Sequence, residues 1–240
     1  MKNQYFGDVN DYLKYGLLRC FSEAGLRIGV CWMLTPDDGR SDGGKIGYLS
    51  KPERWRCYDP TLFDSLSKAV RKNNRLVRYI QNSALLPNAS FFNSPVPDDQ
   101  GARKRWLNRS LRTLGDADLL FFDPDNGIEI KSTSCGRRDS CKFLFWDEIQ
   151  IAWAQRSALL IFQHFCREER DSFVTRLASR LRELLVDSQI VAITTSSVVY
   201  FLVFREYQDV RIGLSLQTIS KKWTGKVLVR GLTRPKAQGV

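Results

Sequence analysis

The chain has few of the features by which a sequence usually indicates its chemistry. It contains a single histidine, His164, and no apolar run that approaches the ~20 residues of a membrane span. Its first eight residues lack the apolar core of a signal peptide. Neither G-x-G-x-x-G nor G-x-x-x-x-G-K-S/T is present. These absences exclude a histidine-rich metal site and the two common phosphate-binding loops, and they predict a cytoplasmic protein with no membrane partner.

Six cysteines are scattered along the 240 residues without a regular spacing. In a reducing compartment such cysteines are free thiols and not a disulfide framework. Cys135, Cys141, His164 and Cys166 could in principle surround a zinc ion, but C-x5-C and H-x-C are not standard zinc spacings. We therefore expect free thiols.

Positive charge is in excess. There are 37 Lys and Arg against 26 Asp and Glu, a formal net charge of +11 at pH 7. Two places concentrate this excess, a predicted helix over residues 102–114 and a tail from residue 221 to residue 240. Clustered cations favour polyanions because binding releases counterions, so nucleic acid is the expected partner. The predicted contacts are Arg103, Lys104, Arg105, Arg109, Lys221 and Lys222. A solvated basic surface without a dedicated partner is the alternative, and the sequence leaves it open.

Short apolar runs that end at turn residues predict the strands. Residues 119–122 run directly into Asp123-Pro124-Asp125-Asn126-Gly127, and similar runs occur at 27–34 and 157–165. Such runs are typical of strands buried on both faces in a parallel sheet. The link between the runs 189–194 and 198–204 is too short for a crossover. It predicts a hairpin, with one antiparallel strand near the C-terminal end of the sheet.

Amphipathic segments between these runs predict helices on both faces of the sheet. Asp11 is the expected N-cap of a helix over 11–24, Asp59 of a helix that begins at Pro60, and Asp147 of a helix within 143–154. We therefore predict one Rossmann-like α/β domain over residues 1–220. It has an irregular aromatic and helical insert at about 46–86 and is followed by a basic tail over 221–240.

The turn after the central strand is the first candidate site. Parallel strands deliver their first polar residues to the carboxyl edge of the sheet, where open α/β folds bind ligands. The candidate catalytic residues are Asp123, Pro124, Asp125 and Asn126, with His164 at the end of the 157–165 strand. An Asx-type turn without chemistry, and a structural histidine, are the alternatives. The acidic, glycine-rich loop at 35–45 is a second candidate ligand site.

Two motifs resemble those of known methyltransferases. Asp123-Pro124 matches the first half of the D/N-P-P-Y/F motif of class I S-adenosylmethionine-dependent methyltransferases, and the strand and hairpin order resembles the C-terminal half of their fold. Asp125 and Asn126 depart from the motif, so the aromatic residue that stacks on a target base is missing. Asn10-Asp-Tyr-Leu-Lys-Tyr15 is similar to the N-x-A-D-V-L-K-H element of the ribosomal-RNA adenine-N6 methyltransferases. That resemblance implies that Lys14 contacts the cofactor.

Two longer strings resemble a bacterial family that has no assigned activity. They are Tyr5-Phe-Gly-Asp-Val-Asn-Asp-Tyr-Leu-Lys-Tyr-Gly-Leu-Leu-Arg19 and Phe121-Phe-Asp-Pro-Asp-Asn-Gly-Ile-Glu129. This likeness covers most of the chain and implies no function.

The methyltransferase resemblance implies S-adenosylmethionine as cofactor and amino groups of nucleic acid as substrate. Asp123 and the Pro124 carbonyl would then accept hydrogen bonds from an exocyclic amine and orient its lone pair, which is catalysis by positioning and without a metal. Asp37, Asp38 and Gly39 would hold the cofactor. Trp146 or Tyr5 could replace the missing aromatic platform.

Two alternatives remain open. Asp123, Asp125 and Glu129 could hold Mg²⁺ for a nuclease or phosphoesterase, because hard oxygen ligands suit this ion. The protein could also be a non-catalytic nucleic-acid-binding module that keeps a degenerate methyltransferase fold.

Overall fold

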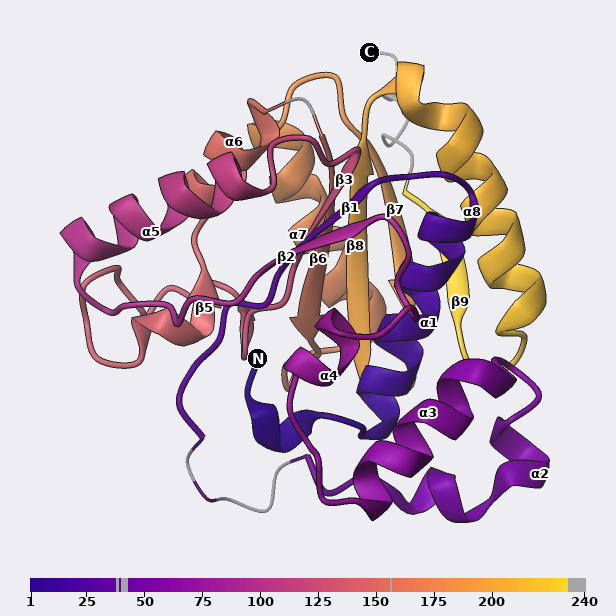
Figure 1. Cartoon of the computed structure of the whole chain (residues 1–240). Helices are drawn as coiled ribbons and strands as arrows, with labels where there is room; N and C mark the ends of the chain where they lie inside the picture. The colour runs from indigo at the N-terminus through magenta and orange to yellow at the C-terminus, as the bar shows by residue number, and fades with distance from the viewer. Residues whose placement is uncertain (38, 40–42, 156, 233–240) are drawn as a thin grey trace.

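A seven-stranded mixed sheet forms the centre of the computed structural model, which describes residues 1–37, 39, 43–155 and 157–232 (Figure 1). The strand order is β2-β1-β3-β6-β8-β7-β9. The strands are β1 (Ile28–Cys31), β2 (Ala89–Phe92), β3 (Leu119–Phe122), β6 (Ala158–His164), β7 (Gln189–Thr194), β8 (Val198–Phe204) and β9 (Leu228–Gly231). A separate two-stranded parallel ladder joins β4 (Gly127–Ile128) to β5 (Phe143–Leu144).

The N-terminal side of the sheet is parallel and the C-terminal end is antiparallel. β2, β1, β3 and β6 run in one direction, while β8 is antiparallel to both β6 and β7, and β9 is antiparallel to β7. The predicted α/β fold, with its reversed strand, is confirmed. The reversed strand lies inside the sheet, between β6 and β7, and is fully buried.

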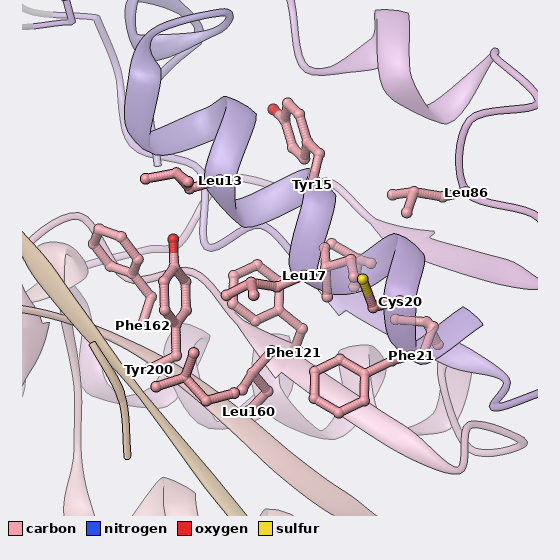
Figure 2. Close-up of a cluster of buried hydrophobic side chains, with 14 of the residues drawn as sticks. Leu13, Tyr15, Leu17, Cys20, Phe21, Leu86, Phe121, Leu160, Phe162 and Tyr200 are labelled. Atoms are coloured by element: carbon pink, nitrogen blue, oxygen red, sulfur yellow. The ribbon is translucent and has the colours of Figure 1, made fainter. Parts of the chain in front are cut away.

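Helices cover both faces of the sheet (Figure 1). One face carries α1 (Val9–Glu23), α3 (Pro60–Arg71) and α8 (Asp209–Lys222), and the other carries α5 (Gln100–Thr113), α6 (Trp146–Trp153) and α7 (Arg170–Leu184). Side chains of β3 alternate between the two cores: Leu119 and Phe121 join the first, Leu120 and Phe122 the second. Figure 2 shows the first core where α1 packs over Phe121 and Tyr200.

The N-cap of α1 lies three residues before the predicted cap. The carboxylate of Asp8 accepts the Asp11 backbone N–H at 2.9 Å, so Asp8 is the N-cap and the prediction of Asp11 was wrong. Asp11 is instead buried within the first turn. The helix packs closely on α8, because a Cβ at Gly16 would lie 2.0 Å from the Trp223 ring.

The other two predicted caps have opposite outcomes. α3 begins at Pro60, and Asp59 accepts the Leu62 N–H at 3.1 Å, as predicted. α6 begins at Trp146, and the Glu148 carboxylate accepts the Phe145 N–H at 2.9 Å, so Asp147 is not the cap. The short helices of the chain are α2 (Pro52–Trp55), α4 (Arg78–Gln81) and the 3-10 turns η1 (Asn3–Tyr5), η2 (Gly47–Ser50), η3 (Ser140–Lys142) and η4 (Glu206–Gln208).

The boundary of the predicted basic tail is wrong. Residues 221 and 222 complete α8, and residues 228–231 form the edge strand β9. This segment is ordered because β9 pairs with β7 along four residues. Residues 233–240 lie outside the described part of the chain. Nowhere in the described part does the chain form a helix long and apolar enough to cross a membrane.

Candidate functional site

A cavity of about 770 Å³ opens at the carboxyl edge of the sheet. β1, β3 and β6 are in register there, with Cys31 beside Phe122 and Phe122 beside Ile161, so the residues that follow β1 and β3 and those at the end of β6 come together. We call this space the edge cavity and define it by six of its lining residues: Asp8, Asp11, Lys14, Asp123, Asp125 and His164.

Lys14 lies between two buried carboxylates. Its Nζ is 2.8 Å from Asp11 Oδ1 and 2.8 Å from Asp123 Oδ2, although Lys14 and Asp123 are 109 residues apart. Burial alone lowers the pKa of Lys14, but the two carboxylates outweigh burial and raise it above its ordinary value. Burial raises the pKa of Asp123, and Lys14 opposes that rise. The Lys14 ammonium is therefore a fixed positive charge whose hydrogen bonds are committed to the protein.

A buried network extends from this ion pair into the core. The second oxygen of Asp11 accepts the Tyr15 hydroxyl at 3.0 Å and the Gly7 N–H at 3.2 Å. The hydroxyl of Tyr200 is directed toward α1 (Figure 2), and burial raises its pKa well above the ordinary value. It is buried without a hydrogen-bond partner in the described structure. The Lys14–Asp123 ion pair joins α1 to the end of β3, and the contacts of Asp11 fix its carboxylate beside Lys14.

Asp125 lines the edge cavity and has one carboxylate oxygen without a hydrogen bond. Its Oδ2 lies 3.3 Å from Lys2 Nζ and accepts the Thr35 hydroxyl at 3.4 Å. Its Oδ1 is 3.8 Å from the α-amino group of Met1, an ion-pair distance that is too long for a hydrogen bond. That amino group donates to the carbonyls of Met33 and Asp123. Asp125 Oδ1 is buried and has no hydrogen-bond partner among the described residues, which is uncommon for a buried polar atom and marks this carboxylate as a candidate functional group.

Two titratable side chains of the cavity have strongly shifted pKa values. Burial and the neighbouring Asp11 carboxylate raise the pKa of Asp8 to about 7. Burial and the Lys14 charge lower the pKa of His164 to about 4, and its ring packs edge-on against Phe162 at 4.8 Å. Near neutral pH His164 is therefore uncharged, while Asp8 can either take up or release a proton.

The predicted turn residues all line the edge cavity, whereas among the described residues of the predicted cofactor loop only those at its end do so. Pro124 and Asn126 lie in the wall beside Asp123 and Asp125. The Asn126 N–H donates to the Lys142 carbonyl at 2.8 Å, which fixes the turn. Asp37 and Gly39 are exposed, and Asp38 lies outside the described residues. The residues of this loop that line the cavity are Gly43, Gly44 and Lys45.

The three carboxylates of the alternative metal site do not form one group. Asp123 is paired with Lys14, Asp125 with Lys2, and Glu129 Oε1 accepts the Trp146 N–H at 2.8 Å. No cluster of three or more His, Cys, Asp or Glu with metal-ligand geometry occurs in the described ranges. The predicted Asp123, Asp125 and Glu129 ligand set is therefore wrong, because the chain after the turn carries Glu129 away to α6.

Some of the predicted nucleic-acid contacts are exposed, and others are buried or ion-paired within the protein. Lys104, Arg105 and Arg109 are exposed on α5, and Lys221 is exposed on α8. Two of the predictions need correction. Arg103 is 1% exposed; its Nε is 2.6 Å from Glu148 Oε1, and its other nitrogens donate to the Ser140 and Phe143 carbonyls. Lys222 is paired with Asp59 at 3.0 Å. Arg103 stabilises the packing of α5 on α6, and its burial keeps it from a phosphate.

Sequence reasoning missed Asp8, Asp11 and Tyr15 as members of the site. Their signal was present, because Asp8, Asp11 and Lys14 are spaced at three residues, the spacing that places side chains on one face of a helix. Asp11 was interpreted only as a possible cap, and Asp8 was given no role. Tyr200 and Lys2 carried no local signal, since they reach the site through tertiary packing.

Comparisons with known proteins give little. Neither a protein-family model nor a curated protein matches this chain. Among solved structures, the crystal structure of a Legionella pneumophila protein assigned to the family DUF519 matches with a TM-score of 0.44 and 11% sequence identity. The match covers 96% of this chain and 98% of that one.

Proposed function

We propose that this protein is an S-adenosylmethionine-dependent methyltransferase that acts on an amino group of nucleic acid. The observation that carries the proposal is the Asp125 carboxylate, which lines a cavity at the carboxyl edge of β3 beside the Asp123-Pro124 turn and whose Oδ1 has no hydrogen-bond partner among the described residues. The internal, reversed β8 strand also agrees with the resemblance to class I methyltransferases.

The residues of the edge cavity fit such a cofactor. A volume of about 770 Å³ is within the range of ~300–1,000 Å³ of small-molecule sites. Asp125 offers an acceptor to a cationic ligand, Lys45 offers a charge to a carboxylate, and Phe143 and Phe165 offer apolar surface to a purine ring. When bound, the cofactor supplies a methyl group on a positively charged sulfur.

Asp125 takes the role that the motif alone would give to Asp123. The Asp123 carboxylate already accepts a hydrogen bond from the Lys14 ammonium, and the Asp123 backbone carbonyl accepts one from the Met1 amino group. Asp125 Oδ1 is free to accept one N–H of the substrate amine, which directs the nitrogen lone pair into the cavity. Such positioning is a large source of rate enhancement.

Asp8 can accept the proton that the substrate amine loses on methylation. An amine nitrogen that forms a new N–C bond must lose one proton, and the acceptor should have a pKa close to the working pH. Asp8 lines the same cavity and meets this condition, whereas His164, with a pKa of about 4, is a weak base. The fixed Lys14 charge opposes a second positive charge on the product nitrogen and so favours release of its proton.

The test is methyl transfer from labelled S-adenosylmethionine to RNA and to DNA extracted from cells. Asp125→Ala should lower the rate by roughly 100-fold, the loss typical of a missing charge-stabilising contact. Asp37→Asn is the control and should retain wild-type activity, because Asp37 is exposed. Wild-type protein that binds nucleic acid but transfers no methyl group to either substrate would contradict the proposal and favour the non-catalytic binding module.

A further inference from the structure

A second, larger cavity adjoins the edge cavity. It has a volume of about 1,390 Å³ and lies between α5, α6, α7 and the connector that follows β4. Ile130, Gln163 and Cys166 line both cavities, so the two spaces share a wall. We call the larger space the helix groove and define it by Lys104, Lys131, Trp146, Ile151, Arg176 and Arg180.

Each element on the rim of the groove except α6 contributes a cation. Lys104 comes from α5, Lys131 from the connector, and Arg176 and Arg180 from α7. The two arginines are ion-paired, Arg176 with Glu168 and Arg180 with Glu183. Both lysines are exposed, and no described carboxylate lies within ion-pair distance of either. They are therefore available to an anionic ligand.

The groove also offers aromatic and apolar surface. Trp146 is half-buried at the start of α6, and the guanidinium of Arg180 lies 6.0 Å from its ring centroid. Ile130 and Ile151, large apolar side chains of the same lining, are 46% and 41% exposed. An aromatic platform beside cations is the arrangement with which proteins bind unpaired bases and their phosphates. The volume exceeds the ~1,000 Å³ upper range of small-molecule sites, so it accommodates more than one nucleotide.

The wall between the two cavities is held rigidly. Gln163 Oε1 accepts the Ile128 N–H at 2.7 Å, and its Nε2 donates to the His164 carbonyl at 2.8 Å. A side chain at Gly127, where φ is +103°, would collide with Gln163. A ligand strand in the helix groove would therefore enter the edge cavity beside the fixed side chain of Gln163.

We infer that the helix groove binds a single strand of nucleic acid, with Trp146 stacked on a base and Lys104 and Lys131 in contact with phosphates. The further step, in which the adjoining nucleotide enters the edge cavity, rests on the proposed function. Strand binding itself does not.

Binding of a fluorescent 12-nucleotide single strand, followed by anisotropy without any cofactor, tests this inference. Lys104→Glu/Lys131→Glu should weaken binding at least tenfold. It should also reduce the slope of log K against log salt by about 1.4, since each lost phosphate contact accounts for ~0.7 in a single strand. Lys68→Glu/Lys72→Glu makes the same charge change at exposed positions on and just after α3, on the opposite face of the sheet, and should weaken binding less than threefold.

Substitution of Trp146 tests the same inference independently of the lysines. Trp146→Ala should weaken binding several-fold with an unchanged salt slope, and Trp146→Phe should restore most of it, because the stacking surface returns. Titrations with RNA and with DNA of the same sequence show which kind of single strand the groove binds. A duplex of that sequence should bind more weakly than either single strand. Equal losses in the two lysine double variants, or wild-type affinity in both Lys104→Glu/Lys131→Glu and Trp146→Ala, would overturn the inference.

The same proteins separate this inference from the proposed function. If the groove variants lose binding and the wild type never transfers a methyl group, the inference stands and the proposed function fails. If the wild type methylates nucleic acid and the groove variants bind it normally, the inference alone fails.

Discussion

Replacement of Lys14 by methionine tests the structure of the site through its energetics. Lys14 is the only side chain that contacts both Asp11 and Asp123 within the described structure, and all three side chains are at most 4% exposed. Methionine keeps the length of the side chain and removes the charge, so two buried carboxylates lose their shared partner. Removal of one member of a buried ion pair costs about 3–5 kcal/mol, because the remaining charge is uncompensated. For a domain of this size that corresponds to a drop of roughly 6–20 °C in Tm.

Urea unfolding followed by circular dichroism measures this loss. The m-value should stay constant, and Lys104→Met, at an exposed and unpaired lysine, should change stability by less than about 0.5 kcal/mol. The double variant Lys14→Met/Asp123→Asn should regain much of the loss, because it removes one of the two uncompensated charges. The deficit should also shrink between pH 7 and pH 5, because burial raises the pKa of Asp123 and, without Lys14 to oppose that rise, its carboxyl group takes up a proton in the folded state. A loss below about 1 kcal/mol, or one that is equal at both pH values, would refute this reasoning.

Three further predictions follow from the same site. Because the pKa of Asp8 is raised to about 7 in the folded protein, the contribution of Asp8 to the unfolding free energy should fall as pH rises from about 4 to about 7. Asp8→Asn, which keeps the cap, should remove this contribution, so the difference in unfolding free energy between wild type and variant should change across that pH range in urea titrations; a constant difference would contradict the raised pKa. The His164 ring resonances, unambiguous because there is one histidine, should titrate near pH 4 in NMR spectra, and the contribution of His164 to the unfolding free energy should fall as pH drops from about 6.5 toward 4; a midpoint near 6.5 would contradict the buried ring. Gly127→Ala should destabilise the protein by more than about 2 kcal/mol, because a Cβ at this positive φ would lie 2.4 Å from Gln163. The control Gly213→Ala has open space around the new Cβ inside α8 and should stabilise the protein by up to about 1 kcal/mol. Equal effects of the two substitutions in thermal melts would show that Gln163 moves freely.

The central part of the fold follows from local patterns. The apolar run of β3 and the hairpin of β7 and β8 were predictable because burial on both faces leaves only apolar residues in a strand. The cap of α3 was predictable because Asp59 and Pro60 act within one turn. These features depend on interactions between near neighbours in the chain.

The composition of the site was less predictable, because it depends on contacts across the chain. The Asp123-Pro124-Asp125 turn was found from its position after β3, but the pairing of Asp123 with Lys14 joins residues 109 positions apart. The basic pattern of α5 likewise did not distinguish Arg103, which faces Glu148 in the interior, from Lys104, which faces solvent. A charge pattern on a helix identifies the cations but not which of them is buried.

The most direct test of the account is calorimetric titration of the protein with S-adenosylmethionine. The account predicts saturable one-site binding to the wild type, binding at least tenfold weaker to Asp125→Asn, and unchanged binding to the exposed control Asp37→Asn. Absence of saturable binding to the wild type, or equal affinity in all three proteins, would contradict the claim that the edge cavity holds this cofactor against Asp125.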